Sequence, residues 1–444
     1  MHLPPDHPLR IELNDEAHAR PSEALQTPLR LTFLALYSDP TQRDREWQHV
    51  CALAHRFGHE PPTRASHYSA DFGPFRLKWE RHSEFTRYKF IAGGPCDEPF
   101  ASPALHAVPA DWLAGLPGEL IVATHAALLP VGAEAPDYEA LATRHFAGNV
   151  LVGAGIAAGA GLALTDFRIR DGFSRLLVLD RSMTQRQAGR MMQRLLEIDT
   201  YRLMALLALP IAQKLTPWLN EAERELAEIT AALVQSSDTA EPVLLERLTR
   251  LEAEIESRES AHHFRFSAAQ AYHELVERRI EELREVRIQG LQTFREFTER
   301  RLAPAMSTCA SVSARVESLS QRVARATQLL STRVAVSRER QNQQVLESMN
   351  RRAEAQLRLQ QTVEGLSAAA ITYYVVGLVG YAAKGLTALG LPVDADLAMA
   401  FSIPLVALAT LLGVRHVRKV VTVSSTHLRA HETPASIAVA VFCV

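Results

Sequence analysis

The chain has 444 residues, few lysines and no pair of cysteines in a CxxC spacing. Its cysteines are scattered, which excludes a disulfide scaffold and a zinc ribbon; they are Cys51, Cys96, Cys309 and Cys443. Arginine carries nearly all the positive charge, because lysine stands only at positions 78, 89, 214, 384 and 419. This bias, together with abundant alanine, is typical of a GC-rich bacterial genome. A net charge of −2 excludes a general attraction to nucleic acid.

Several sequence signals are absent as well. The chain contains no Walker A lysine loop, no GxSxG elbow and no HExxH pair, so no enzyme site of these three kinds is predicted. Charges and prolines recur through the first 30 residues, and no apolar run of signal-peptide length interrupts them. We therefore expect the N-terminus to stay in the cytoplasm.

Residues 1–182 mix strand and helix patterns, which predicts a cytoplasmic α+β domain rather than a doubly wound sheet. Apolar and alternating runs predict strands at residues 29–37, 75–80, 86–91, 119–125, 165–170 and 173–180. The pair 75–80 and 86–91 reads as a hairpin, and Asp171-Gly172 is a two-residue type I′ turn signal between the last two strands. Residues 41–57 carry apolar side chains at helical spacing, and Gly58 ends that helix.

Residues 149–158 (NVLVGAGIAA) imitate a strand followed by GxGxxA, and residues 176–180 end a strand with an acid. That is the outline of a dinucleotide-binding turn, although the acid lies far downstream. The uncharged stretch 146–165 is also a candidate for a third membrane span, but its many glycines and alanines make it only moderately hydrophobic. We favour a packed core over both.

Five segments spread over most of the chain carry a family resemblance. They are HPLRIELNDEAHARP (7–21), FRLKWERHSEF (75–85), TDFRIRDGFSRLLV (165–178), LLEIDTYRLMALLALP (195–210) and YYVVGLVGYAAKGL (373–386). In these the chain resembles a family of bacterial membrane-anchored proteins, the domain of unknown function 3422 family. The resemblance implies a cytoplasmic front domain and a C-terminal membrane anchor, and it implies no activity.

Residues 183–364 predict a stalk of long helices with coiled-coil character. Helices are expected at 190–209, closed by Pro210, at 216–234, opened by Thr216 and Pro217 and broken by residues 236–238, and at 241–303, ended by Pro304. Apolar residues at 312, 316, 319, 323, 326 and 330 form a heptad seam. The seam fits a hairpin folded at Pro304, a pairing between subunits, or an ordinary amphipathic bundle helix.

Residues 365–383 and 397–414 contain no charge, and at ~1.5 Å per residue each spans roughly 27 Å. We predict a two-helix transmembrane hairpin at residues 365–414, followed by a basic cytoplasmic end at 415–422. Basic residues flank both ends of the hairpin, which places those ends in the cytoplasm by the positive-inside rule; they are Arg351, Arg352, Arg358, Arg415, Arg418 and Lys419. A buried soluble hairpin is the alternative.

The last residues, 423–444, read like foreign sequence. THLRAHET (426–433) is what one frame of a common sequencing adapter encodes, and Ile437 and residues 440–443 continue that match. We interpret residues 423–444 as read-through of contaminating DNA, with a short apolar tail as the alternative. His427 and His431 are therefore not interpreted as a metal pair.

Four polar side chains in the front domain form a candidate metal or acid–base site. Glu80 and His82 end a predicted strand, and Glu16 and His18 lie in an adjacent polar segment. Surface or hydrogen-bonded polar residues are the default interpretation, and no catalytic residue, metal or cofactor is assigned.

These observations predict a scaffold or anchoring protein of the bacterial inner membrane, with most of the chain cytoplasmic. Its expected partners are the lipid bilayer and further copies of itself through the stalk, and no nucleic acid. One alternative is an ion transporter with the layout of CorA-type channels, although the Gly-Met-Asn signature is replaced by KGLTALGLPVDAD. A membrane-tethered enzyme is the other.

Overall fold

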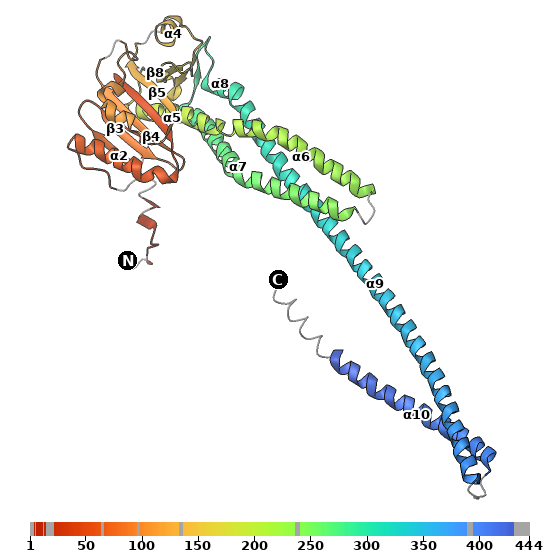
Figure 1. The fold of residues 1–444 in the computed structure, drawn as a ribbon. Coiled ribbons are helices and arrows are strands. Elements are labelled where there is room, and N and C mark those ends of the chain that lie inside the picture. Colours follow the sequence, from red (N-terminus) through yellow and green to blue (C-terminus); the bar gives the residue numbers. More distant parts are fainter. Residues whose placement is uncertain are drawn as a thin grey trace. The chain divides into compact units, whose positions relative to one another are not determined.

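A computed structural model describes residues 4, 6–11, 13–14, 22–63, 66–95, 98–132, 136–235, 240–388 and 394–429, with side chains up to residue 416 in the last range. The chain forms two compact units, Met1–Ser331 and Thr332–Val444. The predicted α+β region, long helices and C-terminal apolar helix are all present (Figure 1).

Strands of the described residues form one nine-stranded sheet in the order β2-β3-β4-β1-β5-β8-β7-β6-β9. Most neighbours are antiparallel, and β5 and β8 are parallel. The bounds are β1 (Leu29–Tyr37), β2 (His67–Asp71), β3 (Arg76–Arg81), β4 (Phe85–Gly93), β5 (Glu119–Pro130), β6 (Val152–Ile156), β7 (Gly161–Thr165), β8 (Ser174–Asp180) and β9 (Val286–Arg287). The predicted β3–β4 hairpin is confirmed.

The two faces of the sheet are covered differently. Helices α2 (Arg43–Arg56), α3 (Ala110–Ala114) and α4 (Tyr138–Phe146) pack over one apolar face. Trp79, Tyr88 and Phe90 are fully buried there beside Trp112 of α3. Helix α5 (Gln185–Leu206) lies over the other face, which is partly polar.

The strand predicted at residues 165–170 is wrong, because β7 ends at Thr165. The hydroxyl of Thr165 accepts a hydrogen bond from the backbone N–H of Phe167, and Asp166 accepts one from that of Arg168, which turns the chain out of the ladder. The turn at Asp171-Gly172 is present, with φ values of 50° and 84°, as a type I′ turn requires.

The dinucleotide-binding turn and the third membrane span are also wrong. Strand β6 is followed by a short 3₁₀ helix, η3 (Ala157–Gly159), and then by antiparallel β7, so no helix begins where a pyrophosphate would bind. The glycines here permit close packing, since a Cβ on Gly153 would lie 2.4 Å from Leu164 Cδ2. The packed core that we favoured is what the structure contains.

The described residues also form the helices η1 (Pro40–Gln42), η2 (Ala104–Ala107), α6 (Leu209–Gln235), α7 (Glu241–Leu283), α8 (Phe294–Arg301), α9 (Ala303–Ala388) and α10 (Ala395–Arg429). Pro210 does not close a helix, because it stands in the first turn of α6, where its missing N–H costs no bond. The predicted cap at Thr216 and Pro217 is wrong too. Both lie inside α6, and the Thr216 hydroxyl donates to the carbonyl of Ala212. The break predicted at 236–238 falls outside the described residues.

The single helix predicted at 241–303 is interrupted. Helix α7 ends at Leu283, Arg284 adopts a left-handed conformation with φ 52°, and β9 then pairs with β6 at the edge of the sheet. Thr293 and Glu296 form a capping box that begins α8. Pro304 stands in the first turn of α9, so the chain does not fold back there.

Helices α6 and α7 and the first part of α9 form a three-helix bundle within the chain (Figure 1). Seam residues Val312, Val316, Leu319, Val323 and Leu330 are buried in it. Arg315 of α9 binds Glu223 of α6 at 2.8 Å. The seam up to Leu330 is therefore that of an amphipathic bundle helix, as one of the three interpretations predicted.

Candidate functional site

The two apolar segments of the second unit lie against each other with their small residues inside. A Cβ on Gly380 of α9 would lie 2.4 Å from Met399 Sδ of α10, so the two helices approach closely at this glycine. The hydroxyls of Thr372 and Thr410 are hydrogen-bonded at 3.1 Å. Small residues and hydroxyl pairs of this kind hold helices together in lipid, where burial of large apolar residues supplies no driving force.

The large apolar side chains of the same hairpin are largely exposed. The most exposed of them, each between 67% and 77% exposed, are Leu366, Tyr373, Tyr374, Leu378, Tyr381, Phe401 and Leu405. In contrast Ala368 and Ala383 are buried. A hairpin in water places its large apolar residues inside, because their burial is what stabilises it. This hairpin has the opposite arrangement, which suits an apolar solvent.

By length and composition, two helices of the described chain could cross a membrane. They are the bent helix Phe294–Ala388, through its apolar end, and Ala395–His416. These contain the two segments predicted as spans. Arg351, Arg352, Arg358 and Arg415 are exposed on α9 and α10, while the side chains of Arg418 and Lys419 lie outside the described residues.

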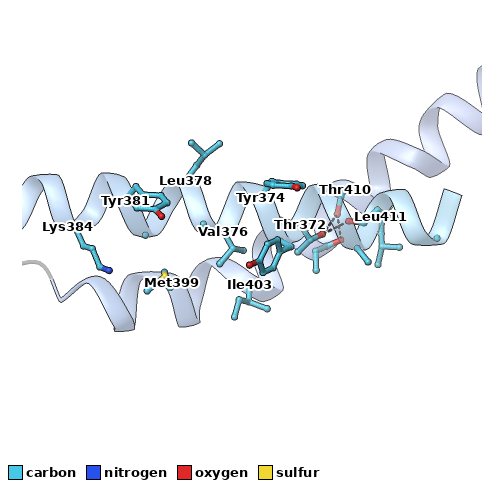
Figure 2. Close-up of a pocket in the computed structure, with 17 residues that line it drawn as sticks. Thr372, Tyr374, Val376, Leu378, Tyr381, Lys384, Met399, Ile403, Thr410 and Leu411 are labelled. Carbon is cyan, nitrogen blue, oxygen red and sulfur yellow. Dashed lines mark hydrogen bonds between the residues drawn. The ribbon is translucent and has the colours of Figure 1, made fainter. Parts of the chain in front are cut away.

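A groove of about 1130 Å³ runs along the hairpin between α9 and α10. Figure 2 shows the Thr372–Thr410 hydrogen bond near one end of the groove and Lys384 near the other. Among the described residues that line it, Lys384 is the one with a charge. The rest of the lining is mostly apolar, with hydroxyl groups from Thr372, Thr410 and the tyrosines.

A second candidate region, a network of charged side chains, lies between the sheet and α5. Alternation along β3 and β4 places Lys78 and Glu80 opposite Lys89 and Arg87 on one face of the sheet. All four side chains are buried. Glu80 accepts a hydrogen bond from Arg87 Nε at 2.6 Å and lies 3.2 Å from Lys78 Nζ. Opposite charges thus compensate each other where water is excluded.

The network continues from the sheet into two helices. Arg87 Nη1 donates to Glu197 of α5 at 3.1 Å, and Arg279 of α7 donates to the other oxygen of Glu197 at 2.5 Å. Earlier in α7, Arg265 forms a two-point ion pair with Glu84 in the β3–β4 turn, at 2.6 and 3.1 Å. Helix α7 is therefore attached to the β3–β4 turn by one arginine–carboxylate pair and to Glu197 of α5, which also binds Arg87 of β4, by another.

These charges shift the titration of their neighbours. Burial alone would raise the pKa of Glu80, but the charges of Arg87, Lys89 and Lys78 outweigh it and hold that pKa at about 2. Burial, followed by repulsion from Arg87, lowers the pKa of Lys89 to about 8. Glu197 behaves as Glu80 does, since Arg87 and Arg279 keep its pKa below the usual value despite burial. Glu80 and Glu197 are therefore ionised at neutral pH.

The structure describes two of the four residues of the site predicted from the sequence. Glu80 is held by Arg87 and Lys78, and His82 lies in the β3–β4 turn, stacked on Phe85 with ring centroids 4.5 Å apart. Glu16 and His18 lie outside the described residues, so the four-residue site stays a prediction. Among the described residues, no group of three or more His, Cys, Asp or Glu side chains could hold a metal ion.

Sequence reasoning missed most of this network. Lys78 and Glu80, like Arg87 and Lys89, are charges two residues apart in otherwise apolar strands, which is a signal of a polar sheet face. Nothing in the sequence shows that Glu197 and Arg279 meet, because 82 residues separate them. In the hairpin, the signal was the presence of Thr372, Thr410 and Gly380, hydroxyl-bearing or small residues within uncharged runs.

Comparisons with known proteins give one match. The family described as "Protein of unknown function (DUF3422)" matches residues 5–421. No curated protein and no solved structure matches the chain. Because the family match covers well over half of the chain, this protein belongs to the DUF3422 family.

Proposed function

We propose that the protein is a membrane-anchored scaffold of the bacterial inner membrane, held by the α9–α10 hairpin. The observation that carries this proposal is the outward placement of large apolar residues around a small and hydroxyl-bearing contact between the helices. In water such a surface would be an aggregation hazard, whereas in a bilayer it meets the apolar solvent that it fits.

The proposed orientation places both ends of the hairpin in the cytoplasm. Arg351, Arg352 and Arg358 precede the first apolar segment, and Arg415 follows the second. The connecting loop has Lys384 with Asp394 and Asp396, so it carries no excess of positive charge. Lys/Arg bias in short flanking segments sets topology, which favours a periplasmic loop.

The scaffold role is proposed for the part of the chain that the anchor holds. What supports it is that the first unit has a sheet, a bundle and buried ion pairs. Neither an ion transporter nor a membrane-tethered enzyme has a specific observation in its favour in the described parts of the chain. We propose homo-oligomerisation as part of the same role.

Charge insertion tests the anchor directly. Leu378 is 67% exposed, so Leu378→Arg in a water-exposed helix would change little. In a bilayer the same change costs about 2.5–3.5 kcal/mol and reduces membrane insertion. Val336→Arg, also at an exposed α9 position but ahead of the apolar run, is the matched control. Equal membrane fractions for the two variants would overturn the anchor.

Topology is tested with cysteines in whole cells, measured against the unsubstituted chain. Ala388→Cys, at the end of α9, is expected to react with a membrane-impermeant thiol reagent, and Arg340→Cys to stay protected until lysis. Cys309 is buried in the bundle and would be protected on either side of the membrane, so it is not the reporter. Labelling of Arg340→Cys in intact cells would invert the proposed orientation. Ion flux through vesicles containing the purified protein would favour the transporter instead.

A further inference from the structure

Between the bundle and the apolar run, α9 is a lone helix. Every side chain from residue 338 to 363 is exposed. At ~1.5 Å per residue this segment is roughly 40 Å long. Isolated helices in water are marginally stable, because most helical stability in proteins comes from packing an amphipathic face.

The exposed segment has an uncharged face. Leu346, Met349, Ala353 and Leu357 are spaced 3, 4 and 4 residues apart, which places them on one side of the helix. Asn342 and Gln360 extend this stripe in both directions by the same spacing. Leu346, Met349 and Leu357 are between 56% and 63% exposed. We refer to residues 342, 346, 349, 353, 357 and 360 as the 342–360 stripe.

Five of the eight charged residues between 338 and 363 collect on the opposite side of the same helix, whereas Glu339, three residues before Asn342, is in line with the stripe. Arg340, Glu347, Arg351, Glu354 and Arg358 are spaced 7, 4, 3 and 4 residues apart. Two of these spacings put a glutamate four residues ahead of an arginine, the favourable order for pairing along a helix. The charges on that side can therefore pair with one another, whereas no residue of the described chain packs against the 342–360 stripe.

The stripe is not a continuation of the bundle seam. Extending the seam spacing beyond Leu330 and Val334 reaches Ser337, Gln341 and Gln344, which are polar. The apolar stripe begins again at Leu346 on another side of the helix. A different side implies a different partner from α6 and α7.

A membrane surface does not fit as that partner. Helix α9 is continuous from this segment into the apolar run at residues 365–383, without a break near Glu364. A helix that runs straight on into a span projects from the bilayer and cannot also lie flat in the interface. For the same reason, two copies anchored in one membrane present this segment in the same direction.

We propose that the 342–360 stripe pairs with the same stripe of a second copy, parallel and in register. Resting on the proposed function, this names the segment by which the anchored protein oligomerises. In such a pair Leu346, Met349 and Leu357 each face their own counterpart. Asn342 and Gln360 also face themselves, and a polar amide at such positions fixes register.

Disulfide trapping in native membranes tests the proposal on the full chain. Met349→Cys and Arg358→Cys place thiols on the stripe and on the charged side. With a copper–phenanthroline oxidant we expect at least tenfold more cross-linked dimer from Met349→Cys than from Arg358→Cys, above the level of the unsubstituted chain. Equal yields, or none from Met349→Cys, would overturn the pairing.

A second measurement keeps the two proposals separable. Met349→Lys puts like charges opposite each other in the pair and is expected to lower the oligomer fraction of the detergent-extracted protein at least tenfold, whereas Thr362→Lys, off the stripe, leaves it unchanged. If the chain sediments with membranes and Met349→Cys does not cross-link, the pairing fails and the anchor stands. If the chain is soluble, the anchor itself fails.

Discussion

Arg87 and Glu80 face each other on neighbouring strands, with 2.6 Å between Arg87 Nε and Glu80 Oε2. The side chains are 4% and 0% exposed, so water cannot compensate either charge. Arg87 also reaches Glu197, which joins the pair to α5 and, through Arg279, to α7. One buried guanidinium thus connects the sheet to the helices that cover it.

Glu80→Gln is expected to destabilise the first unit by about 3–5 kcal/mol, because removing one partner leaves buried positive charge uncompensated. The midpoint of denaturant unfolding, followed by tryptophan fluorescence, measures the change, since Trp79 and Trp112 lie in the core of the sheet. Glu221→Gln is the control: Glu221 pairs with Arg224 at the surface, where both are about 70% exposed. Equal effects of the two substitutions would show that the buried network contributes nothing.

Acid is expected to weaken the same unit. The pKa of Glu80 is about 2 in the folded chain against 4.5 for the free side chain, so its contribution is fully present above pH 4.5 and is lost as the pH falls towards 2. Burial, followed by the charge of Arg175, lowers the pKa of His125 from 6.5 to about 4, which gives a further loss between those values. Unfolding midpoints measured from pH 7 to pH 3 should decline. Glu80→Gln should flatten the part below 4.5, and an unchanged slope would contradict the assignment.

Gly380 is expected to control the approach of α9 and α10. In a chain carrying Thr372→Cys and Thr410→Cys, whose native hydroxyls are 3.1 Å apart, an intrachain disulfide should form readily on oxidation. Adding Gly380→Leu should block it, because even a Cβ there meets Met399, and overpacking costs about 1–3 kcal/mol. Gly377→Leu is the matched control, since a Cβ on Gly377 has no atom within 4 Å. Equal disulfide yields from the Gly380→Leu and Gly377→Leu variants would show that Gly380 does not control the approach of the two helices.

Deleting residues 423–444 is expected to leave expression, membrane insertion and oligomer size unchanged. The expectation rests on the resemblance of residues 426–433 to translated adapter sequence. Resequencing the gene should give a different ending after about Thr422. A clean genomic read through Val444 would contradict it.

Local patterns were enough to predict the elements whose cause is local. Alternation predicts the β3–β4 hairpin, and the Asp171-Gly172 pair predicts the turn before β8. The end of α7 is different, because the sequence after Leu283 continues with good helix formers. What ends the helix is the pairing of Val286 with Gly155, a contact set by the finished sheet.

The period of a seam does not tell which helix covers it. The spacing from Val312 to Leu330 fits a partner in the same chain as well as one in another. The structure places α6 there through Arg315 and Glu223, far apart in sequence. The candidate site has the same difficulty, since Glu80 was recognisable as a strand carboxylate but Glu197, the helix residue that binds its partner Arg87, was not.

The two lysines of the sheet supply a built-in chemical reporter. Lys78 and Lys89 are opposite each other and only 5% and 4% exposed, whereas Lys214, the remaining lysine of the first unit, is exposed on α6. An amine-reactive reagent should therefore modify Lys214 at once and reach the sheet pair only when α5 lifts from the sheet. Burial is the main cause of the lowered pKa of Lys89, so the side chain reacts as an ordinary lysine once it is uncovered. The rate at which Lys89 is acylated would thus report how often α5 separates from the sheet.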